Sequence, residues 1–106
     1  MAKIRVGILG ATGAVGQRFV QLLDRHPQFV VTALAASDRS RGRPYAEACT
    51  WRLPGDVPPS AAALIVQAPE PPLACDLVFS GLPADVAGPM ETRFAQAGYP
   101  VISNSS

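Results

Sequence analysis

The most constraining feature of this chain is a turn with glycine at every third position, residues 10–16 (GATGAVG). The seven residues before it, 3–9, form a short apolar run in which Ile4, Val6 and Ile8 alternate with other residues. Such a run, ended by a glycine turn, predicts a buried β-strand. Beyond the turn the apolar period becomes helical, so the turn is expected to join a strand to a helix.

The predicted helix begins at Gly13 and ends before Pro27, because the residue preceding a proline is pushed out of helical geometry. Apolar side chains at helical spacing predict which face packs on the sheet, and polar side chains predict the solvent face. The expected core face is Val15, Phe19, Leu22 and Leu23, and the expected solvent face is Gln17, Arg18, Gln21 and Asp24.

The remaining elements extend this βαβ unit. A second strand is expected over 29–36, parallel to the first with a right-handed crossover. After a loop over 37–60 with one helical turn near 45–49, the pattern predicts strands at 64–67 and 76–80, a helix over 84–97 capped by Gly98, and a strand starting at Val101. The expected apolar face of the helix over 84–97 is Val86, Ala87, Met90, Phe94 and Ala97. The prolines at 69, 71 and 72 exclude a helix there. The fold class is therefore α/β, a Rossmann-type doubly wound, mostly parallel sheet.

The length and composition of the chain limit the classes of partner that can be expected. A length of 106 residues supports one small domain, residues 1–106. Nine Lys and Arg against eight Asp and Glu give no electrostatic reason to expect nucleic acid as a partner, and no apolar run reaches the roughly 18 residues of a membrane helix. Cys49 and Cys75 form neither a CxxC motif nor a metal-ligand spacing with His26, so we expect no metal and a reducing, cytoplasmic setting.

The chemistry of the glycine turn suits the pyrophosphate group of a ligand. Residues without a Cβ allow the backbone to approach a pyrophosphate, and the following helix directs its N-terminal amides at the negative charge. Thr12 adds a hydroxyl donor, and Gly16 allows close packing of helix on sheet. A purely structural turn is the alternative, but the strand before, the helix after and the second strand favour a dinucleotide.

The end of the second strand indicates which dinucleotide. Ser37, Arg39 and Ser40 can hold a 2′-phosphate through charge-assisted hydrogen bonds, which favours NADP. Asp38 leaves NAD open, because an acid at this place can bind the ribose 2′-hydroxyl. A solvated basic loop around Arg41 is the third possibility.

These motifs together resemble the amino-terminal domain of aspartate-semialdehyde dehydrogenase, in the branch found in archaea and fungi. The resemblance runs from residue 3 to the end and rests on several segments in the same order. They are GATGAVGQRFVQLL at 10–23, TALAASDRS at 32–40, ACTW at 48–51, DLVFSGLPAD at 76–85 and VISNSS at 101–106.

The resemblance implies that the protein reduces aspartyl 4-phosphate to aspartate semialdehyde with NADPH, on the route to lysine, threonine and methionine. In this family a cysteine thiolate attacks the acyl phosphate, hydride reduces the thioester, and a histidine serves as acid and base. By resemblance, the pyrophosphate would contact Gly10, Thr12, Gly13, Ala14 and Val15, the 2′-phosphate would contact Ser37, Arg39 and Ser40, and the ribose and nicotinamide would lie near Ser80, Leu82 and Asn104.

The chain departs from the family in one respect. The family's nucleophile, substrate arginine and histidine follow the Ser-Asn-x-Ser loop, where this chain ends. We therefore expect a truncated NAD(P)-binding domain with no catalytic residue, inactive alone, and a homodimeric or homotetrameric full-length protein. Cys49 and Cys75 are not expected to be nucleophiles, His26 is expected to cap a helix end, and Trp51 is expected to pack under the loop.

Two alternatives remain open from the sequence. A malonyl-coenzyme A reductase resembles the same branch, and its substrate choice would lie downstream of this chain. A non-catalytic nucleotide-binding module belongs to another class of function. N-acetyl-glutamyl-phosphate reductase shares a similar glycine turn, but the segments 49–51 and 82–83 argue against it.

Overall fold

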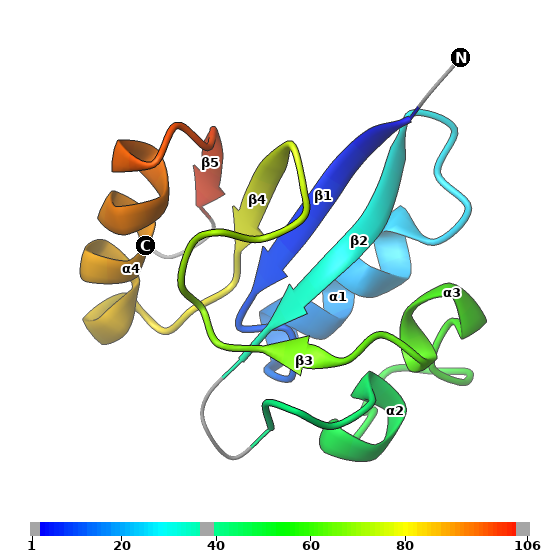
Figure 1. The fold of residues 1–106 in the computed structure, drawn as a ribbon. Helices are drawn as coiled ribbons and strands as arrows, with labels where there is room; N and C mark the ends of the chain where they lie inside the picture. The colour runs from blue at the N-terminus through cyan, green and yellow to red at the C-terminus, as the bar shows by residue number, and fades with distance from the viewer. Residues whose placement is uncertain (1–2, 37–39, 104–106) are drawn as a thin grey trace.

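The computed structural model describes residues 3–36 and 40–103. Strands and helices alternate along most of the chain, as a doubly wound fold requires (Figure 1). The elements are β1 (Ile4–Leu9), α1 (Ala14–Leu23), β2 (Phe29–Ala35), α2 (Tyr45–Ala48), α3 (Pro59–Ala62), β3 (Val66–Gln67), β4 (Leu77–Ser80), α4 (Ala84–Gln96) and β5 (Val101–Ser103).

The five strands form one parallel sheet in the order β3-β2-β1-β4-β5. Ile8 in the central strand β1 lies opposite Leu34 of β2 on one side and Phe79 of β4 on the other. The strand order reverses between β1 and β4, and the crevice at the carboxyl ends of such strands is where open α/β sheets bind ligands. The predicted Rossmann-type class is confirmed.

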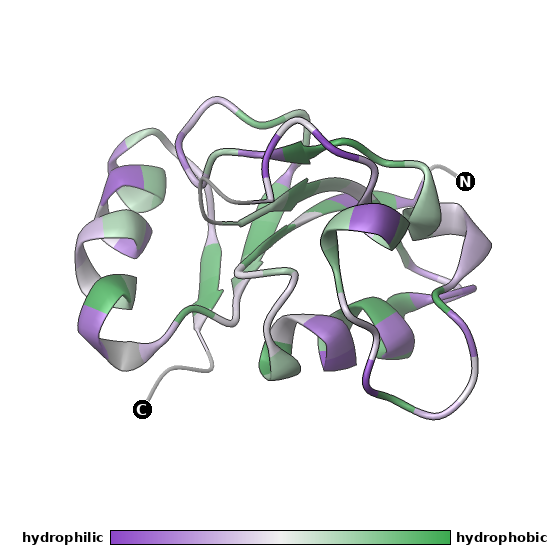
Figure 2. Ribbon diagram, turned by 90° about the horizontal axis from the view of Figure 1, so that it is seen from below, coloured by the Kyte–Doolittle hydropathy of each residue, from purple (hydrophilic) through white to green (hydrophobic). Residues whose placement is uncertain are grey.

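Two apolar layers cover the sheet. On one face Val6, Ile8 and Leu34 pack with α1, α2 and α3, and on the other Leu9 and Val78 pack with α4 and the segment before β4. In Figure 1, α1 lies behind the sheet and the connection from β3 to β4 crosses its front. Figure 2 shows the apolar strands in the middle and the hydrophilic residues mainly on the outer helices and loops.

The predicted packing face of α1 is partly wrong. Leu23 is buried as expected, and Phe19 stacks on Phe79 with ring centroids 5.2 Å apart. Leu22 and Val15, however, are 62% and 37% exposed, and Gln17, expected in solvent, is 1% exposed. The buried residues of the helix are Gly16, Gln17, Val20 and Leu23. The close contact of Gly16 with Gly10 and Ala11, described below, sets the rotation of the helix about its axis.

Other predicted elements are confirmed with small shifts in their ends. The helical turn near residue 45 is α2, no helix forms over 68–76, and Gly98 ends α4 with a φ of +95°. The third strand is shorter than predicted, because Ile65 pairs in an antiparallel bridge with Pro44 and only Val66–Gln67 joins β2. The short helix α3 was not predicted, and it begins with a proline at its first position.

The apolar face predicted for α4 is confirmed in part. Ala87 and Phe94 are buried, and Phe94 packs edge-on against Tyr99 at 5.4 Å. Val86, expected on the same face, is 41% exposed. Across residues 3–36 and 40–103, no helix combines the length and the apolar character that a membrane span needs.

Candidate functional site

Three glycines meet at the carboxyl edge of the sheet. A Cβ built on Gly16 would collide with the carbonyl oxygen of Gly10 and lie 2.7 Å from the Cα of Ala11. A Cβ on Gly81, just after β4, would lie 2.9 Å from the amide nitrogen of Gly16. Gly10 has a φ of +73°, which side chains disfavour, and its Cβ position is 3.0 Å from the Gly81 carbonyl. The fold itself therefore requires these three glycines.

Gly13 lies in the same turn but differs from them. Its φ of −83° and ψ of 173° suit any residue, and a Cβ there would make only an ordinary contact of 3.5 Å with the Gly10 carbonyl oxygen. The residue is exposed. Neither the backbone conformation nor the packing of the described residues requires glycine here, so the missing Cβ leaves space on the outer side of the turn.

The amino terminus of α1 opens into that space. Gly13 is its N-cap and offers no side-chain hydrogen bond, and the first turn holds no acidic residue. Ala14 and Val15, at the first two helical positions, are exposed. Helix amides at such an end and the positive end of the helix dipole attract an anion. The ten-residue helix therefore presents a phosphate-binding geometry beside Gly13.

Two buried polar side chains make hydrogen bonds to the backbone of the glycine turn. The Tyr45 hydroxyl donates to the carbonyl oxygen of Ala11 at 2.7 Å. The Gln17 amide Nε2 donates to the carbonyl oxygens of Thr12 and Thr50, both at 3.0 Å, and its Oε1 accepts from the backbone nitrogen of Arg52 at 2.9 Å. Both side chains were missed by sequence reasoning. They fix the backbone of residues 11–12 against the segment that follows α2.

The segment after β4 lies beside the glycine turn. The Cβ position of Gly10 is 3.1 Å from the backbone nitrogen of Leu82, so the predicted site residues of the two loops are brought together. Leu82 is half-buried against the apolar layer beneath α4. Ser80 is fully buried, and its Oγ has no hydrogen-bond partner among the described residues. An orphaned buried hydroxyl is costly, so this atom is available to a group that the described residues do not supply.

The predicted 2′-phosphate residues lie mostly outside the described part of the chain. Ser37, Asp38, Arg39 and the predicted nicotinamide residue Asn104 are among the residues not described. Ser40 is described and is 8% exposed. It precedes a segment whose Gly42 amide donates to the Val66 carbonyl at 2.7 Å, so it lies near the β3 edge of the sheet.

The two cysteines are buried on opposite faces of the sheet. Cys49 packs in the layer with α1 and Cys75 in the layer with α4. Burial raises the pKa of both thiols, with smaller opposing effects from Tyr45 on Cys49 and from Arg5 on Cys75. A raised pKa lowers the thiolate fraction, which is the opposite of what a nucleophile needs. Among the described residues, no three His, Cys, Asp or Glu side chains group as a metal site would require.

His26 and Trp51 have structural environments. The expectation that His26 caps the helix is corrected: its Nδ1 accepts from the backbone nitrogens of Gln28 at 3.0 Å and Phe29 at 3.3 Å. The accepting nitrogen of the side chain is thus used by the backbone at the start of β2 and not by the end of α1. Trp51 packs against the α1 layer as predicted, and its Nε1 is buried without a hydrogen-bond partner in the described part of the chain.

Known proteins share this arrangement. The family model "Semialdehyde dehydrogenase, NAD binding domain" matches residues 5–106. Aspartate-semialdehyde dehydrogenase from Candida albicans is 47% identical over 99% of this chain, and the enzyme from Methanothermobacter thermautotrophicus is 50% identical over 97%. A crystal structure of aspartate semialdehyde dehydrogenase with NADP from Candida albicans superposes on 99% of the chain with a TM-score of 0.94 and 45% identity.

The matches cover only part of each relative. The chain spans 30% of the length of both curated relatives and 30% of the Candida chain of known structure. A myo-inositol dehydrogenase from Corynebacterium glutamicum, 17% identical with a TM-score of 0.64, shares the fold alone. The similarity to aspartate-semialdehyde dehydrogenases does not favour the malonyl-coenzyme A reductase or the non-catalytic module as alternatives.

Proposed function

We propose a function from one premise: the chain belongs to the semialdehyde dehydrogenases and comprises their NAD-binding domain. The proposed function is to bind NADP for an aspartate-semialdehyde dehydrogenase. When bound, NADPH supplies the hydride that reduces aspartyl 4-phosphate to aspartate semialdehyde, in the biosynthesis of lysine, threonine and methionine. The protein of known structure from Candida albicans, similar over nearly all of this chain, carries NADP.

The observation that carries this proposal is the space at Gly13. Gly10, Gly16 and Gly81 are glycine because the fold packs backbone against backbone there. Among the described residues beyond its chain neighbours and its own helix, the Cβ position of Gly13 meets one atom, at 3.5 Å. A pyrophosphate lying on the α1 amino terminus would occupy that space. The residues present therefore fit the cofactor, and the fit does not depend on the similarity to known enzymes.

The proposed contacts begin at the glycine turn and continue along the carboxyl ends of the neighbouring strands. Ser80 supports the placement, because its buried Oγ lacks a partner among the described residues and would find one in the cofactor or in a water that the cofactor orders. We assign the pyrophosphate to Gly10, Thr12, Gly13, Ala14 and Val15, the 2′-phosphate to Ser37, Arg39 and Ser40, and the ribose and nicotinamide side to Ser80, Leu82 and Asn104.

We assign no catalytic residue to residues 1–106, which we propose form one nucleotide-binding domain. Support comes from the two cysteines, since both are buried and both thiols have a raised pKa. The exposed apolar residues Val86 and Ile102, near the β5 edge, support contact with further polypeptide in the whole enzyme. We propose that the whole enzyme is a homodimer or homotetramer in the cytoplasm.

Titration of NADPH into the purified chain, by fluorescence or calorimetry, tests the cofactor site. Gly13→Ala should weaken binding by about tenfold or more, because the methyl group takes the place of the phosphate at a cost of about 1.4 kcal/mol. Gly88→Ala is the matched control: apart from its chain neighbours and its own helix, no described residue lies within 4 Å of its Cβ position, so the affinity should not change. Undiminished binding by the Gly13→Ala variant would remove the main support for the site.

A second titration separates NADP from NAD. We expect the chain to bind NADPH more tightly than NADH and Arg39→Ala to abolish most of the difference, because the guanidinium would no longer pair with the 2′-phosphate. Arg18→Ala, at an exposed position on α1, should leave the preference intact. Equal affinities in the parent chain would contradict the choice of NADP but not the nucleotide site.

A further inference from the structure

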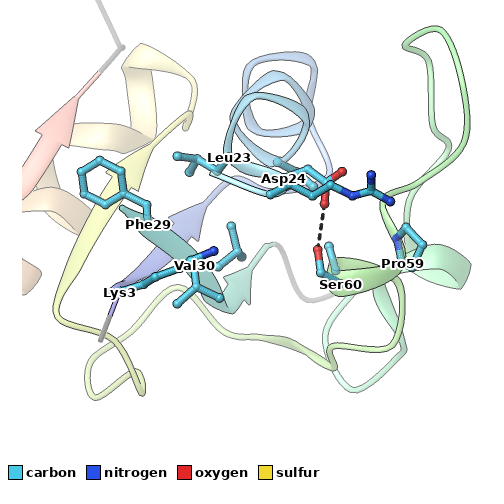
Figure 3. Close-up of a pocket in the computed structure, with 11 residues that line it drawn as sticks. Lys3, Leu23, Asp24, Phe29, Val30, Pro59 and Ser60 are labelled. Carbon is cyan, nitrogen blue, oxygen red and sulfur yellow. Dashed lines mark hydrogen bonds between the residues drawn. The ribbon is translucent and has the colours of Figure 1, made fainter. Parts of the chain in front are cut away.

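A pocket lies at the end of the sheet opposite the glycine turn. It has a volume of about 310 Å³ and is formed by the end of α1, the start of β2 and α3 (Figure 3). Lys3, which lines it, precedes β1, whereas Gly10 follows β1. Six strand residues span roughly 20 Å, so the pocket is separate from the proposed cofactor site.

The floor of this pocket is apolar. Val20 and Ala61 are 1% exposed and Leu23 is 8% exposed, and Phe29 and Val31 are half-buried beside them. The volume is at the lower end of the range for small-molecule sites, and hydrocarbon groups of a ligand would displace water from this floor.

Charges of both signs surround the floor. Figure 3 shows Lys3 and Val30 on one side of the pocket, with Asp24 and Ser60 facing them. Asp24 Oδ1 accepts from the Ser60 hydroxyl at 3.2 Å, which ties α1 to α3. Lys3 and Arg25 make no hydrogen bond or ion pair with any described residue. Two cations and one carboxylate are thus available to a ligand.

The backbone of Arg25 adds to this argument. Its φ of +58° is in the left-handed region, directly after the residue that caps the end of α1. Glycine suits this position best, because side chains are disfavoured there. The chain instead carries a long cationic side chain at the rim of the pocket, at some cost to the fold.

We propose that this pocket binds an α-amino acid with a branched or aromatic apolar side chain. The side chain lies on the floor of Val20, Leu23 and Ala61, the carboxylate pairs with Lys3 and Arg25, and the ammonium group pairs with Asp24. A simple carboxylic acid would bring a like charge near Asp24, and a simple amine would form no ion pair with the exposed Lys3 and Arg25. A zwitterion satisfies all three charges.

Calorimetric titration of the full chain tests the proposal with L-leucine and L-phenylalanine as probes. The comparison ligands are 4-methylpentanoate, which lacks the ammonium group, 3-methylbutylamine, which lacks the carboxylate, and glycine, which lacks the apolar side chain. At least one probe should bind about tenfold more tightly than each comparison ligand. This is the loss expected for one hydrogen bond to a charged group, or, for glycine, for the apolar side chain. No saturable binding of either probe, or equal binding of 4-methylpentanoate, overturns the proposal.

Variants identify the pocket as the place of binding. Asp24→Asn keeps an oxygen for the Ser60 hydroxyl and removes the charge, and Lys3→Ala removes one exposed cation; each should weaken probe binding by about tenfold. Arg18→Ala, on the same helix but outside the pocket, should leave it unchanged. NADPH affinity, measured in parallel, should be the same in all three variants. Probe binding that survives both pocket substitutions rejects this inference and leaves the proposed cofactor site untouched.

Discussion

The Tyr45 hydroxyl donates a hydrogen bond of 2.7 Å to the carbonyl oxygen of Ala11, across 34 residues of sequence. Tyr45 is fully buried, and burial raises the pKa of its hydroxyl far above the ordinary value, so the group remains a donor at any physiological pH. The bond joins α2 to the turn that precedes α1. The short helix therefore supports the backbone that we propose carries the pyrophosphate.

Tyr45→Phe should destabilise the chain and weaken NADPH binding together. Removal of the hydroxyl leaves the buried Ala11 carbonyl without this donor, which costs about 1–2 kcal/mol. The turn then samples more conformations, and because a smaller fraction of molecules has the conformation that binds NADPH, the apparent affinity falls. Urea unfolding gives the stability, and NADPH titration gives the affinity.

Tyr99→Phe is the control for this variant. The Tyr99 hydroxyl bonds both the backbone nitrogen and the carbonyl oxygen of Leu73, each at 3.1 Å, on the α4 side of the sheet. The substitution should cost similar stability without a change in NADPH affinity. If both variants lose affinity in proportion to stability, Tyr45 has no specific part in holding the turn.

Gln17→Leu tests the second support of the turn. The leucine is similar in size and suits a buried position, but it leaves two carbonyl oxygens and the Arg52 amide without the partners that Gln17 provides. We expect a loss of about 2–3 kcal/mol in the free energy of unfolding. Gln21→Leu is matched, because the bond from Arg18 to Gln21 Oε1 at 3.1 Å is exposed, and it should change stability by less than about 0.5 kcal/mol. Equal effects would show that the Gln17 bonds add no net stability.

Local patterns predicted most of the fold. The apolar residues alternate before the glycine turn and follow a helical period after it, and this change predicts the βαβ unit. Such signals can be found in the sequence because each depends on near neighbours along the chain. Gly98 and the prolines at 69, 71 and 72 likewise act through their own backbone geometry. The unpredicted helix α3 is four residues long, too short for a periodic signal.

The candidate site was predicted less completely than the fold. The spacing of apolar residues predicts the packing face of α1 only in part, because the backbone contact of Gly16 with Gly10 sets the rotation of the helix and buries Gln17 in place of Leu22. Gly16 is expected to pack closely on the sheet, and a helix phase taken from that residue places Val20 on the buried face beside Leu23. The bond from Tyr45 to Ala11 joins distant segments, so no local pattern could reveal it.

Gly16→Ala should be strongly destabilising. Its methyl group would collide with the Gly10 carbonyl oxygen and crowd the Cα of Ala11, and these are backbone atoms that cannot rotate away. We expect a loss of about 3 kcal/mol or more from overpacking. Gly88→Ala, in the middle of α4, should change the stability far less, because the gain from a less flexible unfolded chain is opposed by crowding of the new Cβ against the ring of the following Pro89. Thermal unfolding of both variants measures this difference. A mild effect at Gly16 would mean that α1 can move away from the turn.

Asp76 gives the chain a pH-dependent contact at the other end of the sheet. Its carboxylate accepts from the Arg5 guanidinium at 2.9 Å and from the Arg5 backbone nitrogen at 2.9 Å, and these hydrogen bonds lower its pKa from the ordinary 3.8. A lowered folded-state pKa adds stability above the unfolded pKa and loses it as the pH falls through the folded pKa. The parent should therefore exceed Asp76→Asn in melting temperature at pH 7, and the difference should shrink below about pH 4.

Salt provides the check on this pair. Both side chains are about half exposed, so 1 M NaCl should reduce the difference at pH 7. Lys3→Ala, which removes a nearby charge outside the pair, should show no comparable change between pH 3 and pH 7. A difference between parent and Asp76→Asn that persists at pH 2 would assign the effect to packing and not to ionisation.

The cysteines should react slowly with iodoacetamide in the folded chain. Alkylation requires the thiolate and access to it, and Cys49 and Cys75 are 8% and 7% exposed with raised thiol pKa values. At pH 8 we expect labelling at least about tenfold slower than in urea, where unfolded thiols have a pKa near 8.5. Because the folded pKa is raised, the rate should increase mainly above pH 9. Mass spectrometry of peptides after timed labelling separates the two sites.

A cysteine that labels rapidly in the folded chain at pH 7 would have the accessible thiolate of a nucleophile, and the assignment of no catalytic residue to residues 1–106 would then be wrong.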